Sequence, residues 1–193
     1  MLFSQYPPHL ELVPTLNSDI SLRKLMKVHY SQPGGFLGRN ICYGIYYNGQ
    51  YYGHIVGGSA TRYLPGRNEF FNIDGTSLNN IINNVFFHIQ PINNKYPVRN
   101  FSTVVVSQFT LKAQNDWKYK YKDNVIGFET LVEPPRTGEL YKRAGWIYVG
   151  ITKGETCKRI VGHDPTESRF GGIRIWDRIN LRPKLVFCLD VRI

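Results

Sequence analysis

The order of apolar and polar positions predicts that strands and helices alternate along this chain. Apolar residues recur at near-helical spacing between Ile20 and His29, and Asn17 or Ser18 is the candidate cap of that helix. The segment 101–121 is ambiguous, because its apolar residues repeat every four positions while three consecutive valines favour a strand. It is too long for a typical strand, so we predict a helix there. Short apolar runs indicate strands at 9–13, 41–47, 50–60, 84–90, 125–132, 146–152 and 185–189, and polar, turn-rich residues indicate a loop at 62–76.

Two segments carry patterns more specific than periodicity. Within 41–60, Asn48-Gly49 separates two aromatic and β-branched runs, a strong hairpin signal because both residues tolerate a positive φ. Within 125–153, a buried strand stops at Pro134-Pro135, since proline has no N–H to donate to a neighbouring strand. The sequence GELYKRA then predicts a short helix that ends at Gly145, and another strand follows directly.

Both segments resemble parts of the acetyltransferase-like (GNAT) fold. In that fold the helix after the proline turn carries Leu-Tyr and ends at Gly-Phe, where this chain has Leu140-Tyr141 and Gly145-Trp146. The resemblance implies one α+β domain over 1–193, in three layers, with a mixed, mostly antiparallel central sheet and helices on both faces. It leaves 154–184 as a basic, loop-rich C-terminal segment. The alternative is an ordinary strand–helix–strand unit of another α/β domain.

The composition indicates one folded domain without a membrane or secretory segment. The 193 residues are 42% hydrophobic and 14% aromatic. No apolar run approaches the roughly 20 residues that span a bilayer, and the N-terminus shows no signal-peptide pattern. Cys42, Cys157 and Cys188 are odd in number and far apart, so we expect a reducing compartment, the cytoplasm. The histidines show no ligand spacing, so no metal site is expected.

The charge of the chain favours an anionic partner. The formal net charge is +10, and from Leu140 to Ile193 there are 11 Lys or Arg residues against 5 Asp or Glu residues. A basic surface of this kind favours nucleic acid first, then an anionic membrane, and then a phosphate-rich cofactor. A soluble basic protein with no such partner is the alternative interpretation.

Shorter motifs narrow the resemblance. One strand ends at Pro91, a PVRN turn leads to Ser102, Glu133 stands before a proline, and LY-x-x-x-GW follows. From about Arg39 to Lys153, this order is similar to the Mom family, phage DNA-modification proteins built on an acetyltransferase-like fold. The resemblance implies an enzyme that transfers a carbamoylmethyl-type group to adenine N6 in DNA and so protects the DNA from restriction. The alternatives are a nucleic-acid-binding module without transfer activity and a conventional acyltransferase.

The resemblance also implies three catalytic residues. Tyr141 matches the tyrosine of the LY motif and is expected to act as a general acid or a donor to the leaving group. Glu133 stands where Mom proteins have an aspartate, and Ser102 is expected to line the start of the central helix. Structural roles remain open for two of them, Tyr141 as a packed aromatic residue and Glu133 as an exposed acid at the end of a strand.

The donor is expected between the strands that end at Gln90 and Glu133, which this fold requires to be neighbours. Its phosphates are expected at the start of the central helix, where N–H groups are free and the helix dipole is positive. GNAT proteins have a glycine-rich loop there, whereas this chain has NNKYPVRN. Acetyl-CoA bound in an unusual way, an aminoacyl-type donor and no donor at all therefore remain open. The predicted donor-binding residues are Arg99, Asn100, Asn94 and Lys95.

A further surface is expected to bind DNA. Basic residues of the C-terminal segment alternate with aromatic residues, which can hold phosphates and stack on exposed bases. An adenine that reacts at its amino group has to leave the base stack, so a stacking residue is useful there. The alternative is a disordered basic tail with one buried tryptophan. The predicted nucleic-acid-binding residues are Arg39, Lys158, Arg159, Arg174, Trp176, Arg178 and Arg182.

Overall fold

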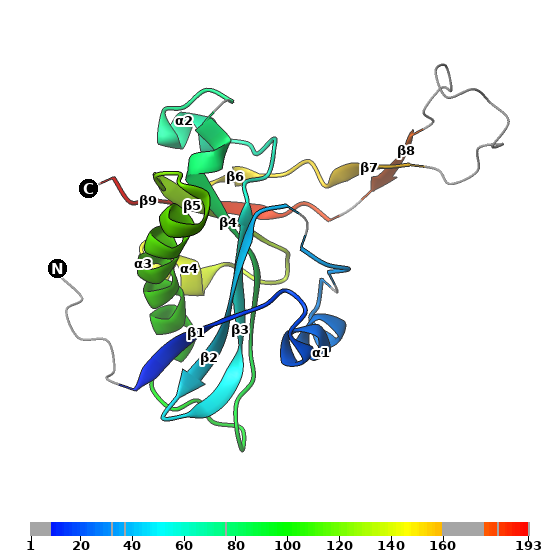
Figure 1. Ribbon diagram of the computed structural model, residues 1–193. Coiled ribbons are helices and arrows are strands. Elements are labelled where there is room, and N and C mark those ends of the chain that lie inside the picture. Colours follow the sequence, from blue (N-terminus) through cyan, green and yellow to red (C-terminus); the bar gives the residue numbers. More distant parts are fainter. Residues whose placement is uncertain are drawn as a thin grey trace, which may run out of the picture.

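The chain forms a central sheet with helices on both of its faces (Figure 1). The computed structural model describes residues 9–31, 33–36, 38–75, 77–159, 176–180 and 182–192. The helices are α1 (Ile20–Val28), α2 (Arg67–Phe71), α3 (Phe101–Tyr121) and α4 (Glu139–Arg143), with a 3-10 turn, η1 (Ser77–Asn80). The strands are β1 (Leu10–Thr15), β2 (Asn40–Tyr47), β3 (Gln50–Ser59), β4 (Ile81–Ile89), β5 (Gly127–Val132), β6 (Ile147–Ile151), β7 (Glu155–Arg159), β8 (Trp176–Asn180) and β9 (Leu185–Asp190).

Seven strands pair in the order β1-β2-β3-β4-β5-β9-β6. All neighbours in this sheet are antiparallel except β4 and β5, which are parallel. A parallel pair requires a crossover connection, and α3 supplies it. The predicted mixed, mostly antiparallel sheet is therefore confirmed, and so is the prediction that the strands ending near Gln90 and Glu133 are neighbours.

Successive residues of the strands pack against different helices, which gives the three predicted layers. α3 covers one face of the sheet with fully buried side chains that include Phe109 and Trp117. On the other face, Leu25 of α1 packs in a cluster with Val56, and Phe71 of α2 packs in a cluster with Ile81 of β4. Figure 1 shows α3 and α1 on opposite sides of the strands.

The predicted hairpin and the predicted long helix are both present. β2 and β3 are joined by Asn48, with φ of 50°, and Gly49, with φ of 73°. The ambiguous segment 101–121 is helix α3, because burying its repeated apolar face on the sheet outweighs the strand preference of its valines. α1 begins after Asp19, one residue beyond the two candidate caps, and the Asp19 carboxylate accepts the Leu22 N–H at 2.9 Å.

Two segments that the sequence predicts to be loops contain regular structure. The polar segment 62–76 holds α2, whose five residues are too few for a periodic pattern to show in the sequence. Within the loop-rich segment 154–184, β7 and β8 pair antiparallel in a small separate sheet. The residues between these two strands lie outside the described part of the chain.

Candidate functional site

The strands β4 and β5 diverge and open a cavity in the middle of the sheet. Their last paired residues are Asn83 and Glu129, and beyond them β5 continues along β9 alone among its described neighbours. The cavity, which we call the splay cavity, has a volume of about 590 Å³. It is lined by the two diverging strands, the end of α1 and the turn into α4, namely 29–31, 83–87, 130–132, 135–141 and Lys184. It is therefore bordered by elements from both faces of the sheet.

Tyr141 is the predicted catalytic residue that lines the splay cavity. Its helix α4 starts at Gly138, where φ is 75° and a Cβ atom would lie 2.4 Å from the ring of Phe187, so glycine alone fits there. The Tyr141 hydroxyl donates a hydrogen bond of 2.7 Å to Asn84 Oδ1. Burial raises the pKa of Tyr141, an effect that the Thr130 hydroxyl opposes. The phenol therefore keeps its proton at neutral pH.

Both polar atoms of the Asn84 side chain form hydrogen bonds: Oδ1 with Tyr141, and Nδ2 with the backbone. Its Nδ2 donates to the carbonyl oxygens of Val56 and Phe86, each at 3.1 Å. Its own backbone carbonyl accepts the Thr130 hydroxyl at 3.1 Å, which bridges β4 and β5 where they begin to separate. These bonds fix the Asn84 amide oxygen as the acceptor for the tyrosine.

A β-bulge in β4 accounts for this geometry. Val56 of β3 pairs with Phe86 and Gly57 pairs with Asn84, so Val85 has no partner in the β3 ladder. Val85 also lines the splay cavity. The bulge thus presents an unpaired stretch of backbone to the cavity, opposite the start of α4.

The end of α1 forms the wall of the splay cavity on the α1 face of the sheet. Burial and then His88 lower the pKa of His29 to about 4, although a hydrogen bond with the Phe87 backbone raises it. His29 is therefore neutral at pH 7, and its Nδ1 accepts the Ser31 N–H at 3.3 Å. The Arg136 guanidinium lies 3.6 Å from the centre of the Tyr30 ring, a cation–π contact that joins this wall to the turn before α4.

The loop before α3 contains three asparagines in a conformation that usually requires glycine. Asn93, Asn94 and Asn100 all have positive φ, between 50° and 60°. Asparagine is the residue other than glycine that adopts this conformation most readily, so the loop turns sharply without glycine. Ile92 and Lys95 exchange two backbone hydrogen bonds of 3.0 Å and close the turn.

The predicted donor-binding residues lie in the loop that leads into α3 and at its N-cap. Asn100 is the N-cap and forms no side-chain capping hydrogen bond, so the first N–H groups of the helix have no side-chain partner from it. Lys95 and Arg99 are exposed in the loop that leads into this helix, and Ser102, the second residue of α3, is half-buried. An uncapped helix start with two cations next to it is suited to a phosphate.

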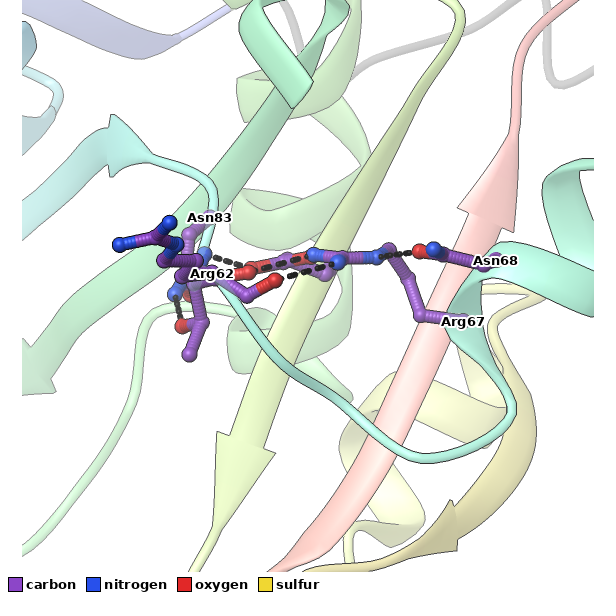
Figure 2. Close-up of polar contacts among 6 residues, drawn as sticks. Arg62, Arg67, Asn68 and Asn83 are labelled. Carbon is purple, nitrogen blue, oxygen red and sulfur yellow. Dashed lines mark hydrogen bonds and ion pairs between the residues drawn. The ribbon is translucent and has the colours of Figure 1, made fainter. Parts of the chain in front are cut away.

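A buried ion pair fixes the loop between β3 and α2. Arg67 donates to Glu129 Oε2 at 2.8 Å and to the Thr61 carbonyl at 2.6 Å, while the Thr61 N–H donates to Glu129 Oε1 at 2.5 Å. Figure 2 shows the Arg67 side chain directed from α2 toward Asn83 and Arg62. Burial raises the pKa of Glu129, while Thr61 and Arg67 oppose that rise. Both side chains are at most 1% exposed, so this pair belongs to the interior.

A second cavity, of about 730 Å³, lies next to the splay cavity and shares Leu131 and Lys184 with it. We call it the cationic cavity, because five of its lining residues are basic and none of its described lining residues is acidic. Its apolar surface includes Leu64 and Leu131. The basic residues are Arg62, Arg67, Lys153, Arg182 and Lys184.

The other predicted site residues lie outside the splay cavity. Glu133 forms an ion pair of 3.4 Å with Lys184 and is not a lining residue of either cavity. Arg39 pairs with Asp123 beside the C-terminal end of α3, far along the helix from Arg99. Lys158, Arg159, Trp176 and Arg178 fall on the paired strands β7 and β8, Arg182 lines the cationic cavity, and Arg174 lies outside the described residues.

Asn84, Thr130, Asn83 and the Arg67–Glu129 pair are site residues that the sequence did not reveal. Asn83-Asn84 in the middle of an apolar strand was the available signal, because two adjacent amides are costly to bury without partners. Among the described residues, no three His, Cys, Asp or Glu side chains are grouped as a metal ion requires, and no helix has the length and apolar character to cross a membrane.

The fold can now be compared with those of known proteins. No protein-family model matches the sequence, and no curated protein is similar to it in sequence. A GNAT family acetyltransferase from Elizabethkingia anophelis with acetyl-CoA bound has a similar structure, with a TM-score of 0.56 and 12% identity over 95% of this chain and 99% of that one. An acetyltransferase from Bacillus subtilis in complex with CoA has a TM-score of 0.52 and 15% identity over 95% and 98%. The chain therefore has the GNAT acetyltransferase fold.

Proposed function

We propose that this protein is an acyltransferase that moves an acyl group from acyl-coenzyme A to an amine. One observation carries the proposal: a buried tyrosine on α4 lies in a cavity between two diverging parallel strands, next to a bulge in β4. The fold neighbours with bound acetyl-CoA and CoA support coenzyme A as the carrier of the acyl group.

Two features support coenzyme A as the donor. The splay cavity lies between the diverging strands, and the exposed residues Lys95 and Arg99 precede a helix whose N-cap, Asn100, forms no side-chain capping hydrogen bond. We infer that this helix start holds the pyrophosphate, with asparagine in the positions of positive φ that glycine occupies in other proteins of this fold. When bound, acyl-coenzyme A would supply an activated acyl group and a thiolate that leaves.

Tyr141 is then the residue that protonates the leaving thiolate, and the proton that the amine loses as the amide forms returns to the Tyr141 oxygen by way of solvent. Its hydroxyl keeps a proton at neutral pH and is held in place by Asn84, which is itself fixed by bonds to both neighbouring strands. The unpaired backbone at Val85 is placed to donate a hydrogen bond to the acyl carbonyl. The amine reaches the carbonyl from the face of the sheet that α1 and α2 cover, opposite α3 and α4.

The test is to measure binding of coenzyme A by calorimetry and release of its thiol from acetyl-CoA in the presence of a panel of amines. We expect binding with a one-to-one stoichiometry and thiol release that depends on the amine. A folded protein that neither binds coenzyme A nor releases thiol would refute the proposal.

Transfer of a carbamoylmethyl-type group to adenine N6 in DNA remains a prediction about the acceptor and the group transferred. It depends on the sequence resemblance to the Mom family and on the net charge of +10. Mass spectrometry of nucleosides from cells that express the protein tests it directly. Modified adenine that requires Tyr141 would support it, whereas an unmodified profile together with thiol release by small amines would favour the conventional acyltransferase.

A further inference from the structure

We propose that the cationic cavity recognises the acceptor, and that the acceptor is an amine that also carries a carboxylate or a phosphate. The proposal rests on the acyltransferase function above and names its class of substrate. It begins from the charge of the cavity, which has five basic lining residues and no acidic one among those described. A cavity of one sign concentrates ligands of the opposite sign.

Three of the five cations are available to a ligand. Arg67 is neutralised by Glu129, and Lys184 forms an ion pair with Glu133. Arg62, Lys153 and Arg182 are exposed, and in the described part of the chain none of the three forms an ion pair with a carboxylate. An anion that enters the cavity would therefore meet cations that are not already paired.

The cavity is built before any ligand arrives. The Arg67 guanidinium holds the carbonyl oxygens of Thr61 and Arg62, at 2.6 and 3.2 Å, and so fixes the loop that carries the Arg62 side chain. On the opposite wall, Thr152 and Lys184 exchange two hydrogen bonds of 2.9 Å, one of them through the Thr152 hydroxyl. Figure 2 shows Arg62 and Asn83 together at the end of the Arg67 network.

Asn83 connects this cavity to the site of transfer. It lines the splay cavity, and its Nδ2 donates to the hydroxyl of Thr61, which lines the cationic cavity, at 2.9 Å. Its Oδ1 is buried without a hydrogen-bond partner, and the residue is 5% exposed. A buried acceptor atom without a donor is costly, and an amine N–H would satisfy it. The shared residues Leu131 and Lys184 make the two cavities adjacent, so one ligand can reach both.

The arrangement of the cations favours a small acceptor over a nucleic acid. Single-stranded or duplex DNA requires cations that follow its backbone along a groove. Here Arg62, Lys153 and Arg182 converge on one cavity with an apolar surface at Leu64 and Leu131. We therefore assign the cavity to the anionic end of a small amine.

The first test measures anion binding to the whole protein. Glutarate and inorganic phosphate, the two probes, separate carboxylate from phosphate recognition and are titrated while the melting temperature is followed. The cavity variant is Arg62→Ala/Lys153→Ala, and its matched surface control is Arg23→Ala/Lys27→Ala on the exposed side of α1. We expect at least one probe to raise the melting temperature, with about tenfold weaker binding in the cavity variant and no change in the control.

A third variant, Lys95→Ala/Arg99→Ala, reports binding at the start of α3. A response lost only in this variant would place the anion at the donor site and overturn the proposal, as would the absence of any response in the wild type. Binding of coenzyme A is measured in the same proteins and should persist in the cavity variant. If no variant binds coenzyme A while the anion response depends on Arg62 and Lys153, the acyltransferase function fails and the anion site stands.

The second test compares amines in pairs that differ in one anionic group: 4-aminobutyrate with 4-aminobutanamide, and phosphoethanolamine with ethanolamine. With acetyl-CoA as donor, we expect kcat/KM for the anionic member of at least one pair to be about tenfold higher or more, and this preference to disappear in Arg62→Ala/Lys153→Ala. Equal rates, or a preference for the amines without the anionic group, would overturn the proposal. So would a cavity variant that loses binding to a duplex oligonucleotide while both small anions leave the wild type unchanged. If none of these amines reacts, the anion titration alone decides.

Discussion

The splay cavity and the cationic cavity share Leu131 and Lys184, yet their walls follow different rules. At the bottom of the splay cavity the polar groups are neutral and bonded to one another: the tyrosine to Asn84, and Asn84 to the strands on either side. Around the cationic cavity five lining residues are charged, and the buried ion pair of Arg67 with Glu129 holds the wall in place. The difference separates two tasks, since a neutral, preorganised network suits proton transfer and an open set of cations suits recognition.

This comparison assigns different kinetic consequences to the two cavities. Changes in the tyrosine network should lower kcat, because they act on the leaving group in the transition state. Changes at the rim of the cationic cavity should mainly raise KM for the acceptor, because they act on binding. Each prediction below tests one side of this division.

The largest effect is expected for Tyr141→Phe. If the hydroxyl protonates the thiolate, the rate of thiol release should fall by roughly 10²–10⁴-fold while the KM for acyl-CoA changes little. Because the hydroxyl donates to the buried Asn84 Oδ1, its removal should also cost about 1–3 kcal/mol of the free energy of unfolding.

Thr130→Val is the control for that loss of stability. It removes another buried hydrogen bond to Asn84, at 3.1 Å, and leaves the phenol in place. We expect a similar loss in denaturant unfolding but a much smaller loss of rate. A Tyr141→Phe enzyme as active as Thr130→Val would show that the tyrosine only packs. The assignment of proton transfer to the splay cavity would then be wrong.

The next largest effect concerns the buried pair under the cationic cavity. Arg67→Met leaves Glu129 buried without its partner, so the free energy of unfolding should fall by about 3–5 kcal/mol, measured by urea denaturation. The double variant Arg67→Met/Glu129→Gln removes both charges and should recover part of this loss. If Arg67→Met unfolds at the wild-type urea concentration, the pair does not hold the wall.

Much of the fold was available from the sequence because local signals agreed with the tertiary structure. The turn residues Asn48-Gly49 have the positive φ that their chemistry favours, and Gly138 and Tyr141 lie at the start of a helix as the proline turn predicts. In α3 the spacing of apolar residues outweighed three valines, because a long helix buries one continuous face. The two halves of the GNAT-like pattern were thus encoded within short windows.

The walls of the two cavities could not be obtained in this way. Arg67 and Glu129 are 62 residues apart, and their meeting depends on α2, a helix of five residues with no pattern of its own. The bulge at Val85 lies opposite Gly57 of β3, and such a glycine can mark either a bulge or a close approach of two backbones without showing which of them is present. The loop before α3 was uncertain for another reason: it has no glycine, and its sequence alone does not show that three of its asparagines adopt a positive φ.

A smaller effect tests where the donor phosphates bind. Lys95→Ala/Arg99→Ala should weaken the binding of coenzyme A by about tenfold or more, since hydrogen bonds to a charged phosphate contribute about 1.5–3 kcal/mol each. Calorimetry measures the affinity for coenzyme A, and the binding of pantetheine, which has no phosphate, should be unaffected. Arg23→Ala/Lys27→Ala, which removes the same charge from α1, is the control. Equal affinities in the two double variants would mean that the phosphates lie elsewhere.

The smallest effect is a pH dependence that arises in the wall of the splay cavity. The pKa of His29 falls from its ordinary value of 6.5 to about 4 in the folded protein, first because of burial and then because of His88. Between these values the unfolded chain binds a proton that the folded protein does not, so stability should decrease as the pH falls from about 6.5 toward 4 and change no further from this cause below that range. The contribution to the slope is at most about 1.4 kcal/mol per pH unit.

His29→Gln should remove this contribution, so its unfolding free energy should fall less steeply than that of the wild type between pH 6.5 and 4. Burial also lowers the pKa values of His54 and His88, so a residual dependence of the same sign should remain. Urea denaturation at several pH values measures both curves, and His9→Gln, a change of the same kind at an exposed position, is the control. Parallel curves for wild type and His29→Gln would show that His29 takes up its proton in the folded state. The α1 wall would then carry a positive charge in mild acid, and the neutral network at Tyr141 would share its cavity with a charged imidazole below that pH.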